Sequence, residues 1–295
     1  MRLERPFSRL PLRFDAERLA DEAASLPASA WRPHPEGLAG NTAVPLVAVG
    51  GLPANDSTRG AMAPTPHLAH CPYLQQVLAS FQTVIGRTRL MRIEGEGEVR
   101  RHVDTNYYWW EHLRLHIPVR TTPDVTFECG PEAVHMAAGE AWVFDTWRQH
   151  RVRNLATTDR IHLVIDTVGS ATLWDMIDID GEAAPDATLA PGAGRAELLF
   201  ERVNHPTVMT PSEVVGNLQA LSREAAAHGA DGGVDLIDRQ LRRFRHQWSA
   251  AWAAFGESPD GWATFEGIRA AADAAIDDHA DRWRLSNGID LVEAI

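Results

Sequence analysis

Short apolar runs separated by turn residues occupy this chain from about residue 86 to residue 170. Gly, Pro, Thr and Asp gather between the runs, as in the segment Thr121-Thr122-Pro123-Asp124. Frequent turns between short strands are typical of an antiparallel sandwich or barrel. We therefore expect a mainly β core of the jelly-roll type. The predicted strands are residues 88–93, 113–119, 125–128, 141–145 and 161–167.

Different patterns flank this core. The N-terminal part predicts a strand and a helix, followed by a long loop at 40–75 that is rich in Pro, Gly, Asn and Thr and suits a lid or a substrate-binding segment. The C-terminal part is Ala-rich with helical spacing, which predicts a helical subdomain of three helices. The expected organisation is an N-terminal α/β segment with the long loop (1–85), the β core (86–180), a linker (181–210) and the helical subdomain (211–295).

Composition and charge limit the class of protein. Hydrophobic residues make up 44% and charged residues 23% of the 295, as in a globular protein with a real core. The formal net charge of −12 argues against a nucleic-acid partner, which needs a basic surface. Two cysteines imply no disulfide framework, and we see neither a signal peptide nor a membrane span. We expect a cytoplasmic protein without a membrane partner.

The motif His102-Val103-Asp104 is the first candidate for chemistry. In a strand, residues i and i+2 lie on one face, so His102 and Asp104 can point into the same cavity. His150, from a distant strand, would complete a set of two histidines and one carboxylate, which holds iron(II) and leaves three positions open. Arg160, ten residues further on, suits a dicarboxylate because a guanidinium pairs with a carboxylate through two parallel hydrogen bonds.

A His-x-Asp sequence alone is weak, because a strand-end histidine often bonds to a nearby aspartate. Its context strengthens the metal interpretation: the motif ends a predicted strand, and His150 follows a turn and a buried strand that runs toward the same end of a barrel. The run 139–145 with His150, Asn154 and Arg160 resembles the second half of the aspartyl/asparaginyl β-hydroxylase family, which includes bacterial hydroxylases of free amino acids such as proline. The matching segment covers residues 86–170.

This resemblance implies a double-stranded β-helix (jelly-roll or cupin-like) that binds iron(II), 2-oxoglutarate and O2. Position by position, it implies His102, Asp104 and His150 as metal ligands and Arg160 as the partner of the distal carboxylate of 2-oxoglutarate. Arg114 and His116 match an Arg-x-His that lies along the co-substrate and substrate side of the family's pocket.

Several of these residues also have plainer interpretations. Arg114 could instead form an ion pair with Glu111, and His116 could be a structural core histidine. The aromatic run 106–110 fits either a pocket wall or a core cluster. The charged C-terminal helices fit a solvated face, a cap over the site or the surface of a homodimer.

The sequence thus predicts a 2-oxoglutarate-dependent non-haem iron dioxygenase. It would hydroxylate an unactivated C–H bond of an amino acid, either free or as an Asp/Asn-type residue in a peptide or a carrier-bound intermediate, with succinate and CO2 as co-products. Desaturation or epimerisation at the same site is a further outcome. The alternative is a non-catalytic, metal-binding cupin-like sensor or binding module, which has no need of Arg160.

Overall fold

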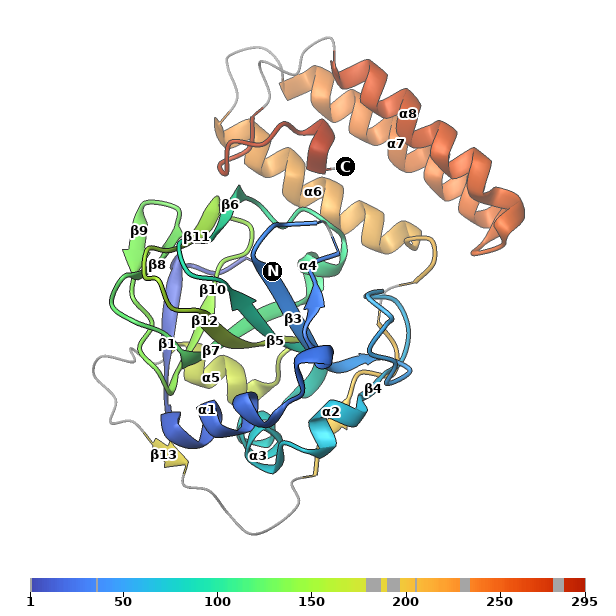
Figure 1. Ribbon diagram of the computed structural model, residues 1–295. Coiled ribbons are helices and arrows are strands. Elements are labelled where there is room, and N and C mark those ends of the chain that lie inside the picture. The colour runs from blue at the N-terminus through green and yellow to red at the C-terminus, as the bar shows by residue number, and fades with distance from the viewer. Residues whose placement is uncertain are drawn as a thin grey trace. The chain divides into compact units, whose positions relative to one another are not determined.

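A computed structural model describes most of the chain. The chain divides into two compact units, Met1–Asn204 and His205–Ile295. The described residues are 2–35, 37–178, 187–189, 197–204, 206–228, 234–277 and 284–294. Each unit is described by itself below (Figure 1).

A large, mostly antiparallel sheet forms the body of the first unit (Figure 1). Over the described residues its strand order is β13-β1-β10-β7-β12-β5-β3-β2, with β14 added to β5 and β4 added to β3. The bounds are β1 Phe7–Phe14, β2 Arg32–Pro33, β3 Asn41–Val49, β4 Met62–Pro64, β5 Val84–Ile93, β7 Leu113–Arg120, β10 Glu140–Phe144, β12 Arg160–Thr167, β13 Ala187–Leu189 and β14 Leu199–Phe200.

A smaller sheet packs against this one. Its order is β6-β11-β8-β9, from Glu98–His102, His150–Asn154, Val125–Cys129 and Glu132–Val134. One apolar cluster joins the two sheets: Phe7 and Phe144 from the large sheet contact Phe127 and Val152 from the small one. Two sheets that share such a core form the predicted double-stranded β-helix, and the fold class is confirmed.

Alternation along β7 and β12 separates the two faces of the large sheet. Leu115 and Leu163 belong to the apolar core on the outer face, while Arg114, His116 and His162 alternate with them and point between the sheets. The outer core also contains side chains of the helices α1 (Ala16–Ser25), α3 (Pro72–Ser80) and α5 (Ala171–Asp178). The interior face is therefore the polar one, and it carries the candidate site. Shorter helical elements of this unit are η1 (Ala28–Ala30), α2 (Pro66–Ala69) and α4 (Tyr108–Glu111).

The predicted long loop at 40–75 is wrong. Its first part is β3, an inner strand of the large sheet, and its last part contains β4, α2 and the start of α3. The loop was predicted from the Pro, Gly, Asn and Thr content of this segment, since these residues are typical of turns. Here the segment bends at Pro45, where the pairing with β5 shifts register, and the Pro45 carbonyl accepts a bond from the Thr65 hydroxyl.

The segment expected as a linker contributes to the first unit wherever it is described. β13 pairs with β1, and β14 pairs with β5. Glu201 and Asn204 then bond to residues of the strand region around 58–62. The residues 179–186 and 190–196 lie outside the described part of the chain.

The second unit consists of helices, as predicted: α6 (Pro211–His228), α7 (Val234–Phe255) and α8 (Trp262–Asp277), with the short turns η2 (Pro259–Gly261) and η4 (Val292–Ala294). Thr210 and Glu213 cap the start of α6 reciprocally, since the Thr210 N–H donates to the Glu213 carboxylate and the Glu213 N–H donates to the Thr210 hydroxyl. Trp248 of α7 packs on Phe265 of α8. No helix in the described ranges combines the length and apolarity needed to cross a bilayer.

Candidate active site

Three predicted ligands come together at one end of the small sheet. His102 ends β6, Asp104 follows two residues later, and His150 begins β11. Antiparallel pairing places His150 directly opposite His102, with ring centroids 4.2 Å apart. One side-chain ligand atom from each of the three residues lies within 4.8 Å of the others. Strand register thus brings together side chains that are far apart in the chain.

Both imidazoles are oriented by backbone carbonyls. The Nδ1 atom of His102 lies 2.8 Å from the Arg100 carbonyl, and the Nδ1 atom of His150 lies 2.9 Å from the Arg148 carbonyl. A carbonyl only accepts hydrogen bonds, so Nδ1 carries the proton and Nε2 offers its lone pair. Burial lowers the pKa of His150 to about 4, which keeps this imidazole neutral at pH 7. A histidine that binds a metal through one ring nitrogen typically donates a hydrogen bond from the other, as both imidazoles do here.

Asp104 is held by a buried arginine. Arg114 donates from Nη1 to Asp104 at 3.2 Å and from Nε to Asp166 at 3.1 Å, and its guanidinium lies over the Trp109 ring at 3.9 Å. Arg87 bonds to the other oxygen of Asp166 at 3.3 Å. Burial acts to raise the pKa of Asp166, but Arg114, Arg87 and Arg89 outweigh it and hold that pKa below its usual value. Arg114 therefore positions the candidate ligand Asp104.

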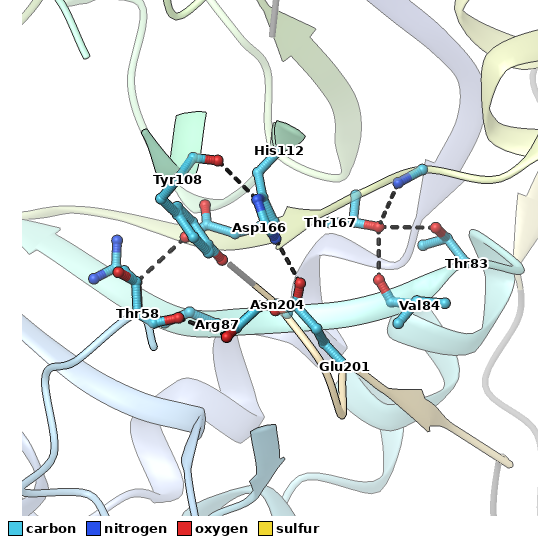
Figure 2. A network of polar contacts seen from close by, with 12 residues as sticks. Thr58, Thr83, Val84, Arg87, Tyr108, His112, Asp166, Thr167, Glu201 and Asn204 are labelled. Atoms are coloured by element: carbon cyan, nitrogen blue, oxygen red, sulfur yellow. Dashed lines mark hydrogen bonds and ion pairs between the residues drawn. The ribbon is translucent and has the colours of Figure 1, made fainter. Parts of the chain in front are cut away.

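Figure 2 shows the polar network beside this chain of ion pairs. His112 donates from Nδ1 to the Tyr108 carbonyl, and its Nε2 atom lies 2.7 Å from the Glu201 carboxylate. The proton on Nδ1 is used in the bond to the Tyr108 carbonyl. A second proton must therefore lie between Nε2 and Glu201 for this contact to be attractive. The Tyr108 ring stacks on His112 at 3.7 Å and meets Trp109 edge-on. Part of the aromatic run 106–110 is thus a buried cluster that supports Arg114.

A second buried polar group lies further along β7 and β12. Arg160 donates from Nη2 to Nδ1 of His162 at 2.7 Å, and Nδ1 of His116 lies 3.3 Å from the same atom. Three atoms of this group have no hydrogen-bond partner among the described residues: Nε of Arg160 and Nε2 of both His116 and His162. Phe144 contacts His116 and His150, so it bridges this group and the three ligands.

The electrostatics of this second group favour an anion. Burial lowers the pKa of Arg160 to about 9, which still leaves a cation at pH 7. Burial, together with the Arg160 charge, also keeps the pKa of His116 and of His162 well below the usual value, so both rings are neutral. Nδ1 of His162 accepts from Arg160, so the unused Nε2 of this ring is a donor, and together with the buried cation it suits a carboxylate. The neutral His116 ring donates from Nδ1 to His162, and its Nε2 can only accept.

These depressed pKa values predict acid sensitivity of the metal-free protein. In the unfolded chain, His116, His150 and His162 bind protons as the pH falls through about 6.5, while in the folded chain they do not. The contribution of these histidines to the free energy of unfolding should therefore be constant above pH 7 and fall below pH 6.5, by about 1.4 kcal/mol per pH unit for each histidine. Urea unfolding at several pH values measures this slope. His116→Gln should make it shallower and His70→Gln, an exposed control, should not; equal slopes in all three proteins would contradict a neutral buried His116.

Comparison with known proteins agrees with the geometry. Residues 43–169, somewhat less than half of the chain, match the model of the aspartyl/asparaginyl beta-hydroxylase family. This segment is similar to that family. It contains the three candidate ligands, Arg114 and Arg160. The family match thus confirms the resemblance inferred from the sequence, and it covers the segment in which the candidate ligands lie.

The chain is also similar, at low identity, to several solved structures. A 2OG-Fe(II) oxygenase family oxidoreductase from Burkholderia pseudomallei is 14% identical, with a TM-score of 0.40 over 54% of this chain and 80% of that one. A Pseudomonas putida prolyl-4-hydroxylase is 14% identical, with a TM-score of 0.39 over 56% and 93%. A prolyl hydroxylase from Trichoplax adhaerens, in complex with a peptide fragment of hypoxia inducible factor, is 10% identical, with a TM-score of 0.40 over 58% and 87%. The similarity to the family rests on the family model and not on these structures.

Some residues of this site were not found from the sequence. Asp166 appeared only as the end of an apolar strand, and Arg87 and Glu201 were not considered. Asp166 does carry a signal, because an aspartate that continues the alternation of Arg160 and His162 must lie on the same interior face. Glu201 carries no such signal, since its position depends on the pairing of β14 with β5.

Proposed function

We propose that this chain is an iron(II)- and 2-oxoglutarate-dependent dioxygenase that hydroxylates an unactivated C–H bond of an amino acid. The amino acid is free, or is an Asp/Asn-type residue of a peptide or carrier-bound intermediate. The observation that carries the proposal is the combination of a two-histidine, one-carboxylate set with the buried, incompletely paired Arg160. Succinate and CO2 would be the co-products.

The three-residue set fits iron(II). His102 and His150 present Nε2 lone pairs, and Asp104 is kept in place by Arg114. Three ligands on one side leave coordination positions for a chelating co-substrate and for O2. Bound iron(II) would supply the activation of O2, with 2-oxoglutarate as the source of two electrons, so that one oxygen atom enters succinate and the other enters the product alcohol.

The second polar group fits the far end of 2-oxoglutarate. Arg160 has an unused Nε–H, and it comes from the strand next to β7, which carries His116. Because Nδ1 of His162 accepts from Arg160, the neutral His162 ring carries its proton on Nε2 and has a second donor to offer. These residues would bind and orient the carboxylate, while the apolar side chains around them, Phe127 and Phe144, exclude water.

Arg160 also separates this function from the alternative, a non-catalytic cupin-like binding module. A module that only holds a metal ion gains nothing from a buried cation that is next to neutral imidazoles and lacks a carboxylate partner, and such a cation disfavours folding unless an anion joins it. The oxidative outcome, hydroxylation or desaturation, depends on how the substrate is oriented and is decided by product analysis.

The test is an anaerobic titration of the purified protein with iron(II) and then 2-oxoglutarate, followed through the weak visible charge-transfer band of the chelate. We expect a saturable band in the wild type. It should be lost in His150→Ala and Asp104→Ala, with iron(II) affinity at least ~100-fold weaker, because even the partners of metal ligands contribute 10–100-fold. His70→Ala, at an exposed site, is the control. Iron(II) binding without any band would support the binding module instead.

A further inference from the structure

One more buried arginine lies on the interior face of β5. Arg89 is 8% exposed, and its guanidinium makes no hydrogen bond or ion pair within the described ranges of the chain. Burial lowers the pKa of Arg89 to about 9, so it is a cation at pH 7. A buried cation without a paired carboxylate is unfavourable unless an anion joins it.

Strand register places Arg89 beside the site already described. It lies opposite Val164 of β12, and Val164 lies opposite His116 of β7. In the neighbouring row, Asp166 lies opposite Arg114. Residues of one row in adjacent strands share a face of the sheet, so Arg89 points into the same interior as His116 and Arg114.

The local charge balance leaves room for one anion. The charged groups that act on Arg89 are Arg87, Arg114, Asp166 and Asp56. Asp166 already accepts bonds from Arg114 and Arg87, and Asp56 is exposed, so water screens its charge. Three guanidinium groups (Arg87, Arg89 and Arg114) therefore face two carboxylates, the buried Asp166 and the partly buried Asp104, and one positive charge remains.

This site differs from the one around Arg160. Arg160 lies opposite Ile93, whereas Arg89 lies opposite Val164, so the two positions are offset by four residues along the paired strands, or about 13 Å. The chain of ion pairs from Asp104 through Arg114 to Asp166 ends next to Arg89. Arg89 and Arg160 thus suit two separate anions, and the first is the one linked to the candidate metal ligand.

We propose that Arg89 binds a carboxylate of the primary substrate and selects substrates that carry one; this inference rests on the proposed function. Two sources have this chemistry: the α-carboxylate of a free amino acid, and the side-chain carboxylate of an acidic residue within a peptide. In either case the carboxylate neutralises Arg89, and the rest of the substrate extends toward His102, Asp104 and His150.

The experiment uses the anaerobic complex with iron(II) and 2-oxoglutarate, and calorimetry as the readout. The probes are the common L-amino acids, their carboxamides, and end-blocked peptides that contain either Asp or Asn. We expect at least one carboxylate probe to bind. The amide counterpart of that probe should bind the wild type at least ~30-fold more weakly, as for a lost charge-assisted hydrogen bond. The carboxylate probe should bind the Arg89→Met variant more weakly by the same factor. A free amino acid that binds identifies the first source, and an Asp peptide that binds identifies the second.

A second measurement does not depend on ligands. In the metal-free protein, Arg89→Met should raise the Tm by a few degrees, because it removes an unpaired buried charge; Arg92→Met, on the same strand but bonded to Thr42 and near Asp159, should not. A lower Tm for Arg89→Met would show a structural role and overturn the proposal. So would a wild type that forms the chelate yet binds none of the probes, or binds them as well after substitution. If the wild type forms no chelate, it is the proposed function that fails.

Discussion

Arg160→Met is expected to weaken 2-oxoglutarate binding by about 100-fold or more, while iron(II) affinity stays within about threefold of the wild type. The guanidinium is buried and its Nε–H has no partner among the described residues, so it can donate to a carboxylate in the interior. It lies on β12, whereas the three candidate ligands lie on or next to the strands of the small sheet. Loss of its charge should therefore affect the co-substrate and spare the metal.

The measurement is the iron(II) titration followed by the 2-oxoglutarate titration, each under anaerobic conditions. Methionine replaces the unbranched stem of arginine with an uncharged chain of similar shape, so the variant should fold. Arg92→Met is a matched control, because Arg92 lies on the neighbouring strand β5 and donates to Thr42. Unchanged 2-oxoglutarate affinity in Arg160→Met would show that Arg160 does not bind the co-substrate. Loss of both affinities would instead indicate that Arg160 supports the whole interior.

The proximity of His102, Asp104 and His150 could be predicted because it depends on local rules. Alternation places His102 and Asp104 together, and a strand that begins at His150 brings its ring to the same end of the barrel. The partners of these residues follow from strand order and register. Arg114 reaches Asp104 and Asp166 only because β7 lies beside β12, and no spacing in the sequence encodes that neighbour.

The strand β3 is an element that the sequence analysis predicted wrongly. Its residues are apolar and suited to a strand, yet Pro45 and the nearby Gly, Asn and Thr predicted a loop. The structure tolerates Pro45 at a register shift, where the ladder with β5 is already interrupted. In the same way, β14 was hidden in a segment expected as a linker, although it completes the surroundings of His112 through Glu201. In both cases, pairing with β5 stabilises a strand whose local sequence favours a loop.

Arg114→Met should destabilise the first unit by about 3–5 kcal/mol, the usual cost of removing one partner from a buried ion-pair network. Asp166 is 1% exposed and would keep only Arg87, and Asp104 would lose its ion pair. The measurement is the exchange protection of the β7 and β12 amides, which reports on this unit by itself. Arg87→Met is the comparison. It should lower the free energy of unfolding by less, because Arg87 bonds to Asp166 but not to Asp104.

The same substitution should also lower iron(II) affinity by roughly 10–100-fold, since Asp104 would no longer be oriented. Arg114→Lys distinguishes charge from geometry: an ammonium group restores the positive charge, but it cannot reach two carboxylates as the planar fork does. We therefore expect Lys to recover much of the stability and little of the metal affinity. Full recovery of both would mean that only the charge of Arg114 matters. Undiminished metal affinity in Arg114→Met would mean that Asp104 finds its position without it, and that Arg114 is free to serve the substrate side of the site.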